Sequence, residues 1–155
     1  MPVQTGYIDS AGHPRIKIGV YGLSEALKQE FEAIIDTGFT GFLMMPFMQA
    51  LPLGLTLYGT GDFTLADGST SPRLLALGWV DVEGEKTGGV IVLEGNASYP
   101  LLGMDFLRKC KKALLVARAG AILVDEDRFV AAIKAAAEAA EATLTPQLQD
   151  PPAGT

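Results

Sequence analysis

The 155-residue sequence contains one cysteine, Cys110, and one histidine, His13. A single thiol excludes an intrachain disulfide and fits a reducing compartment. His13 lies in the turn-like segment "DSAGHP", where we expect a solvated side chain, so a Ser-His or Cys-His catalytic pair is disfavoured. The chain also lacks a His-x-x-x-His pair and a cysteine cluster of the kind that binds zinc. We therefore expect no metal and no cofactor.

Basic residues and long apolar runs are also scarce. Twelve Lys and Arg residues stand against 18 Asp and Glu residues, a formal net charge of -6, which argues against a nucleic-acid-binding surface. The one short basic run, Arg108 to Lys112, is expected to be a solvated face at a helix end. No stretch approaches the ~18 consecutive apolar residues of a membrane span, and "MPVQTGYIDSAG" has no signal-peptide features. The sequence predicts a cytoplasmic protein that binds neither nucleic acid nor membrane.

Most of the chain has the pattern of β-strands. Arg15 to Val20 alternates apolar and polar residues, which is the period of a half-buried strand. Asp67-Gly68 and Gly84 each lie between two strand-like runs, as in β-hairpins. The expected strands of this antiparallel meander are residues 63–66, 70–82 and 87–93. The sequence therefore predicts a mainly β domain.

Three helices are expected besides the strands. A short helix is predicted near Met48 and another after Gly103, where Asp105 is placed to cap the helix or to favour its N-terminus. The clearest helix is Asp127 to Leu144, which carries a thin, alanine-rich apolar stripe. The predicted organisation is a domain over residues 1–124, a helix over 125–144 that packs on it or at an interface, and a flexible tail over 145–155.

A carboxylate lies between two apolar runs in "FEAIIDTGFTGFLMMP". Asp36-Thr37-Gly38 directly follows Ile34-Ile35, although aspartate is among the residues that are least often fully buried without a partner. Asp-x-Gly is also a common turn signal, so one alternative is a monomeric structural β-domain in which Asp36 is only a turn residue. Two later features favour a functional site: a hairpin with the small polar tip Asp67-Gly68-Ser69, and "LLGMDFL", in which two apolar residues and a glycine precede a helix.

These three features, in this order, resemble the retropepsin-like aspartic proteases over Pro14 to Arg108. The segment "DTGFTGF" looks like a short prokaryotic branch of that family. The resemblance implies a closed β-barrel of the acid-protease fold with a flap hairpin, one short helix after the turn glycine, and here an added C-terminal α-helix. It also implies an aspartic endopeptidase, which needs no metal and no cofactor.

The resemblance also assigns the site residues. Asp36, Thr37 and Gly38 would form the catalytic triplet, and Thr37 would hydrogen-bond across a dimer. One chain has one triplet, and 155 residues leave no room for a second lobe. The second carboxylate would therefore be Asp36 of a second copy in an isologous homodimer that cleaves peptide or protein substrates. Asp105 as a second carboxylate within the chain is the less favoured alternative.

The flap and the substrate groove would use a further set of residues: Phe39, Ala66, Asp67, Gly68 and Ser69. Phe39 occupies a position where family members usually have a small residue, which predicts a narrower or differently shaped groove. Because a fold does not determine a function, the alternative function is a catalytically latent retropepsin-fold module that binds peptides or serves as a scaffold.

Overall fold

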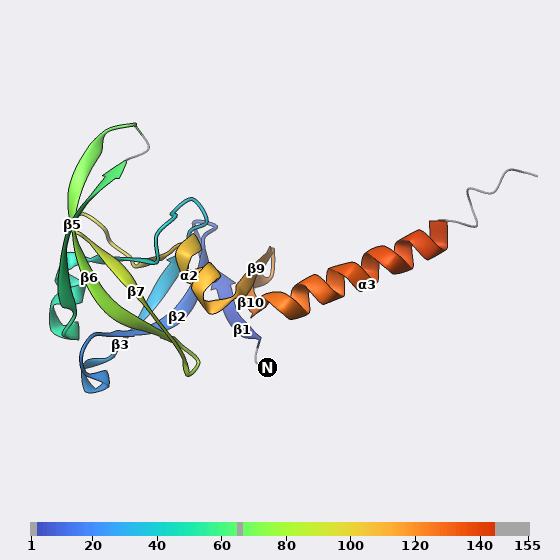
Figure 1. The fold of residues 1–155 in the computed structure, drawn as a ribbon, viewed down its shortest axis with the longest axis horizontal. Helices are drawn as coiled ribbons and strands as arrows, with labels where there is room; N and C mark the ends of the chain where they lie inside the picture. The colour runs from blue at the N-terminus through green and yellow to red at the C-terminus, as the bar shows by residue number, and fades with distance from the viewer. Residues whose placement is uncertain (1–2, 65–66, 145–155) are drawn as a thin grey trace, which may run out of the picture.

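The computed structural model describes residues 3–64 and 67–144, and its strands form one sheet (Figure 1). The sheet order is β5-β6-β7-β4-β8-β3-β2-β1-β10-β9. The strands are β1 (Gln4–Ile8), β2 (Pro14–Tyr21), β3 (Gln29–Ile35), β4 (Leu43–Pro46), β5 (Thr56–Thr64), β6 (Thr70–Val82), β7 (Glu85–Glu94), β8 (Leu101–Leu102), β9 (Lys112–Ala117) and β10 (Gly120–Asp125). The helices are α1 (Phe47–Ala50), α2 (Met104–Cys110) and α3 (Glu126–Leu144), with 3-10 turns at Glu25–Leu27 and Leu51–Leu53.

A second pairing closes part of this sheet into a ring. Strand β2 pairs with β3 and also with β6, where Val20 lies opposite Val80. The strands from β6 through β7, β4, β8 and β3 to β2 therefore surround a common interior. That interior is filled by buried apolar side chains such as Ile18, Val20, Leu43, Met45, Val80, Ile91 and Leu102. The predicted mainly β fold, with a closed sheet, a short helix after Gly103 and a C-terminal helix, is confirmed.

The short strand β8 determines the path of the connection between β3 and β4, because it pairs with both strands. Strand β3 runs parallel to β8, with Ile35 opposite Leu102, and β4 runs antiparallel to β8, with Leu43 opposite the same Leu102. Because β3 and β4 flank β8, residues 36–42 must pass around its end, next to Gly103. The fold thus brings the Asp-Thr-Gly segment against the turn that precedes α2.

The hairpin of β5 and β6 begins earlier than the sequence pattern predicts. The expected strand was residues 63–66, but β5 already begins at Thr56 and runs through the glycines of "YGTGD". Gly59 has φ 151°, and the register shifts there between Leu57 and Gly59, so a bulge lets the strand continue through this segment. Residues 65 and 66 of the expected strand lie outside the described part of the chain. The expected strand 70–82 coincides with β6.

The C-terminal helix α3 follows directly on β10 and projects away from the β-sheet body (Figure 1). It corresponds to the helix predicted over Asp127 to Leu144, and none of its residues is buried. The predicted division between residues 1–124 and 125–144 stays a prediction, and the predicted tail 145–155 lies outside the described residues. Within residues 3–64 and 67–144, no helix is long and apolar enough to cross a membrane.

Candidate active site

Asp36 directly follows β3 and is held by hydrogen bonds within its own loop and to β8. Its backbone N–H donates to Leu102 O at 2.8 Å. Its carboxylate Oδ1 accepts a hydrogen bond from Gly38 N at 2.8 Å, and its backbone oxygen accepts from Phe39 N at 3.1 Å. This is the side-chain turn that an Asp-x-Gly segment favours. Asp36 is half-buried, Thr37 and Gly38 are exposed, and no ion pair involves Asp36 among residues 3–64 and 67–144.

Backbone hydrogen bonds fasten the rest of this loop to the turn before α2. Met104 N donates to Phe39 O at 2.8 Å, Asp105 N donates to Gly41 O at 3.1 Å, and Gly103 N donates to Phe42 O at 3.1 Å. A Cβ atom at Gly103 would lie 2.1 Å from Gly41 O, so the close approach of the two backbones requires a glycine there. The turn that follows "LLG" in the sequence therefore holds the Asp36 loop in place through these backbone hydrogen bonds.

The Phe39 side chain is folded against this support. A Cβ atom at Gly41 would lie 2.5 Å from Phe39 Cζ, and a Cβ atom at Gly103 would lie 2.6 Å from Phe39 Cδ1. The ring therefore occupies the space that both glycines leave open, and Phe39 is half-buried. That Phe39 shapes a substrate groove stays a prediction. The structure shows a different feature of Phe39, which is that its ring packs against its own loop and the turn before α2.

The tip of the β5–β6 hairpin carries the remaining predicted site residues. Asp67 Oδ1 accepts hydrogen bonds from Ser69 Oγ at 2.6 Å and from Ser69 N at 2.9 Å, and these bonds lower the pKa of Asp67. Gly68 has φ 83°, which favours glycine at the tip. Ala66 lies outside the described residues. Within the part of the hairpin that is described, no hydrogen bond joins the tip to the Asp36 loop.

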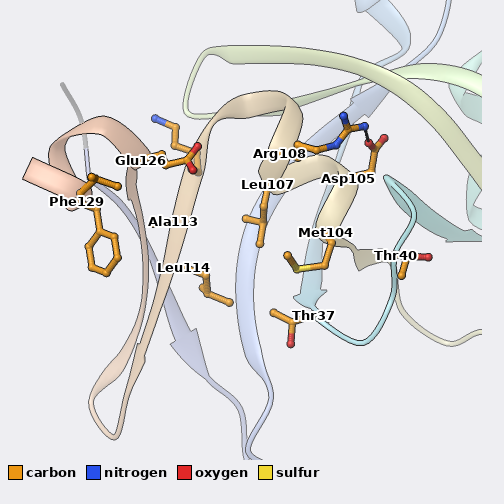
Figure 2. A pocket seen from close by; sticks show the side chains of 12 residues that line it. Thr37, Thr40, Met104, Asp105, Leu107, Arg108, Ala113, Leu114, Glu126 and Phe129 are labelled. Carbon is orange, nitrogen blue, oxygen red and sulfur yellow. Dashed lines mark hydrogen bonds and ion pairs between the residues drawn. The ribbon is translucent and has the colours of Figure 1, made fainter. Parts of the chain in front are cut away.

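Two hollows adjoin the loop. The smaller, about 450 Å³, is lined by Asp36 and Thr37 together with the β1–β2 turn and β9, including His13, Leu114 and Val116. The larger, about 710 Å³, extends from Thr37 and Thr40 past α2 to the first turn of α3 (Figure 2). No sequence pattern predicts that Leu114 or His13 lies near Asp36, because strand pairing brings each of them there.

The expectations for Asp105 and for the basic run after Gly103 are each confirmed only in part. Asp105 does lie in the first turn of α2, where an acid favours the helix N-terminus. Gly103, not Asp105, is the N-cap of α2, and no side chain caps the helix. Asp105 lies in the first turn, where burial raises its pKa but the pairs with Arg108 and Lys109 outweigh this, so the net pKa is lowered. Lys112, expected on a solvated face, is buried, because Asp125 and Glu85 accept hydrogen bonds from its Nζ at 2.7 and 3.3 Å.

Comparisons with known proteins agree with this geometry at the level of the fold. No family model matches the sequence, and no curated protein matches it. The EIAV protease in complex with the inhibitor HBY-793 is similar in structure, with a TM-score of 0.56 and 12% identity over 70% of this chain and 97% of that one. A retropepsin-like aspartic protease from Rickettsia conorii has a TM-score of 0.54 and 17% identity over 79% of this chain and 90% of that one. The chain therefore has the retropepsin-like fold.

Proposed function

We propose that the protein is an aspartic endopeptidase in which Asp36 from each of two copies forms the catalytic pair. The observation that supports this most directly is the placement of Asp36. Its carboxylate is held by Gly38 N at 2.8 Å on a loop fastened to the turn before α2, and its neighbours Thr37 and Gly38 are exposed. A rigid, half-buried carboxylate on an accessible loop suits the approach of a second carboxylate.

The chemistry follows from two carboxylates at close range. Two such groups about 3 Å apart cannot both ionise easily, so they share one proton and titrate as a coupled pair. The ionised Asp36 acts as a general base and removes a proton from the attacking water. The protonated Asp36 of the other copy donates its proton toward the oxygen of the scissile carbonyl. The water oxygen bonds to the carbonyl carbon and gives a gem-diol. The Asp36 that took the water proton passes it to the amide nitrogen, and one diol hydroxyl returns its proton to the other Asp36. The C–N bond then breaks, so that an amine and a carboxylic acid leave without a covalent enzyme intermediate.

The other predicted site residues support this reaction in the proposed dimer. Thr37, exposed beside Asp36, hydrogen-bonds across the two-fold axis, and Gly38 leaves room for the substrate backbone. The β5–β6 hairpin, with Asp67, Gly68 and Ser69 at its tip, closes over an extended peptide and excludes water. Both similar structures are named as proteases, and one of them is a complex with an inhibitor. This favours a peptidase activity over a latent binding module.

The proposal is tested by replacing Asp36 with asparagine, which keeps the Oδ1 acceptor for Gly38 N. Cleavage of a denatured protein such as casein, followed between about pH 4 and pH 7, should fall by about a thousandfold in Asp36→Asn. The fold, measured by circular dichroism and thermal unfolding, should be unchanged. The matched control is Asp105→Asn, which should retain cleavage. Cleavage that survives in Asp36→Asn, or is lost in Asp105→Asn with the fold intact, would contradict the assignment.

A further inference from the structure

Helix α3 exposes an apolar stripe along its length. Val130, Ile133 and Leu144 are 44%, 52% and 54% exposed, and with Ala137 and Ala140 they recur at spacings of three and four residues, so they lie on one side of the helix. The helix has 19 residues, none of them buried, whereas helices in proteins gain most of their stability from the packing of an amphipathic face. The stripe therefore needs a surface to cover it.

The direction in which α3 leaves the body is fixed at its first turn. Lys112, with a side chain only 2% exposed, forms ion pairs with Asp125 at 2.7 Å and with Glu85 at 3.0 Å. Burial opposes the charge on Lys112, but these partners outweigh it and its pKa is raised. The backbone N–H of Glu126 donates to Lys111 O at 2.9 Å. The base of α3 is thus anchored, and its remaining turns stand free of the body.

An apolar groove of about 710 Å³ lies beside this base. Figure 2 shows that it is bounded by α2, by β9 and by the start of α3, with Thr37 at one end. Its apolar lining consists of Met104, Leu107, Ala113, Leu114, Phe129 and Val130. Because Thr37 follows Asp36, a second copy that brings its own Asp36 to this loop also approaches this groove.

The charges around the groove complement the far half of α3. The end of α2 carries three basic residues, Arg108, Lys109 and Lys111. Two acids lie beside them: Asp105, which pairs with Arg108 and Lys109, and Glu126, which also lines the groove. Arg108 lines the groove and has a side chain that is 77% exposed. Beyond Lys134, α3 carries two glutamates, Glu138 and Glu141, and no basic residue. A helix that brought its apolar stripe into the groove would therefore place Glu138 near the end of α2, where basic residues outnumber acidic ones.

We propose that this groove is the docking site for α3 of a second copy. The two helices are exchanged about the two-fold axis, so that each covers the groove of the other chain and both stripes are buried. The alanines of the stripe allow the helix backbone to approach the groove closely, and Ile133 supplies the large side chain. This inference rests on the proposed Asp36 dimer, and it assigns α3 as the element that joins the two subunits outside the catalytic loops.

Cross-linking between two different chains tests the position of the helix. One chain carries Met104→Cys in the groove and a size tag, and the other carries Ala137→Cys on the stripe, both in a Cys110→Ala background. A short bismaleimide should join the tagged and untagged chains. The matched control, Ala135→Cys on the opposite side of α3, should give several-fold less product. Equal yields from Ala137→Cys and Ala135→Cys, or no product between chains, would overturn the proposal.

The dissociation constant of the dimer gives an independent test in the full chain. Ile133→Lys changes a residue that is half exposed in one chain, so the fold should persist while the dimer weakens by about 100-fold, because two isoleucines are lost per dimer. Ala135→Lys should leave the constant unchanged, as measured by sedimentation equilibrium. If Ile133→Lys has no effect while Asp36→Asn is inactive, the docking proposal fails and the peptidase proposal stands. If Asp36→Asn cleaves, the peptidase proposal fails.

Discussion

Phe39 and Gly103 are packed against each other although they lie far apart in the sequence. Met104 N donates to Phe39 O at 2.8 Å, and the Phe39 ring covers the open side of Gly103, where a Cβ atom would lie 2.6 Å from Phe39 Cδ1. The loop that carries Asp36 is therefore shaped by a contact with the turn before α2. The position of the carboxylate depends on that contact as well as on the local turn.

Replacement of Gly103 by alanine should destabilise the fold strongly. The new Cβ would lie 2.1 Å from Gly41 O and 2.5 Å from Phe39 O, both backbone atoms that cannot turn away. We expect a loss of about 3 kcal/mol in the free energy of unfolding, measured by urea denaturation. Gly95→Ala is the control, because a Cβ at Gly95 has no atom within 4 Å. Equal stability of the two variants would contradict the packing described for the loop.

Replacement of Phe39 by alanine should lower cleavage. The ring fills the space over Gly41 and Gly103, so its removal lets the Asp36 loop move, and a misplacement of about 1 Å can slow an enzyme by about 100-fold. Phe39→Leu, which keeps part of the contact, should be intermediate in kcat/KM. Faster cleavage by Phe39→Ala would instead mean that the ring obstructs the groove. That outcome would agree with the small residue that members of the resembled family usually have at this position.

Stability at low pH should depend on Asp9. The side chain of Arg15 donates to Asp9 Oδ2 at 2.7 Å, and this bond, aided by the backbone N–H of His13, lowers the pKa of Asp9 to about 2. The unfolded chain has a value of about 3.9, so the carboxylate stabilises the fold above about pH 4, and this contribution is lost as the pH falls through about 2. Asp9→Asn should lower Tm at pH 7 and match the wild type below about pH 2. A constant difference at every pH would contradict the ion pair.

The thiol of Cys110 should be slow to react and unnecessary for activity. Cys110 is partly buried against the core, and burial raises the pKa of its thiol to about 11, so little thiolate is present at neutral pH. Alkylation by iodoacetamide at pH 7.5 should be much slower than that of free cysteine, and Cys110→Ala should cleave as the wild type does. Rapid alkylation, or loss of cleavage in a folded Cys110→Ala variant, would reopen a catalytic role for the thiol.

The features predicted correctly from the sequence are those set by local chemistry. Asp-x-Gly indicates a side-chain turn, and Gly38 N does donate to Asp36 Oδ1. Asp67-Gly68 indicates a hairpin tip, and Gly68 has the positive φ that such a turn requires. The short helix after the turn glycine of "LLGMDFL" was predicted through the resemblance to retropepsin-like proteases, and α2 does begin directly after Gly103.

The features that the sequence did not predict depend on contacts between distant segments. Lys112 belongs to a run of basic residues and was expected in solvent, but Glu85 and Asp125 surround its amino group in the folded chain. The Phe39 ring covers Gly41 nearby, but its contact with Gly103 forms only where the chain returns to this loop. Strand β5 continues through Gly59 because its partner β6 supplies a ladder on which a bulge can form.

The central claim is that each active site needs Asp36 from two chains, and a mixing experiment tests it most directly. Wild-type and Asp36→Asn chains are mixed at a ratio of roughly one to three and left to exchange partners. Peptide cleavage is then measured per wild-type chain. With random pairing, about a quarter of the wild-type chains find a wild-type partner, so cleavage per wild-type chain should fall to about a quarter. Cleavage per wild-type chain that is unchanged by the excess would show that a single Asp36 suffices, and it would contradict the two-chain site.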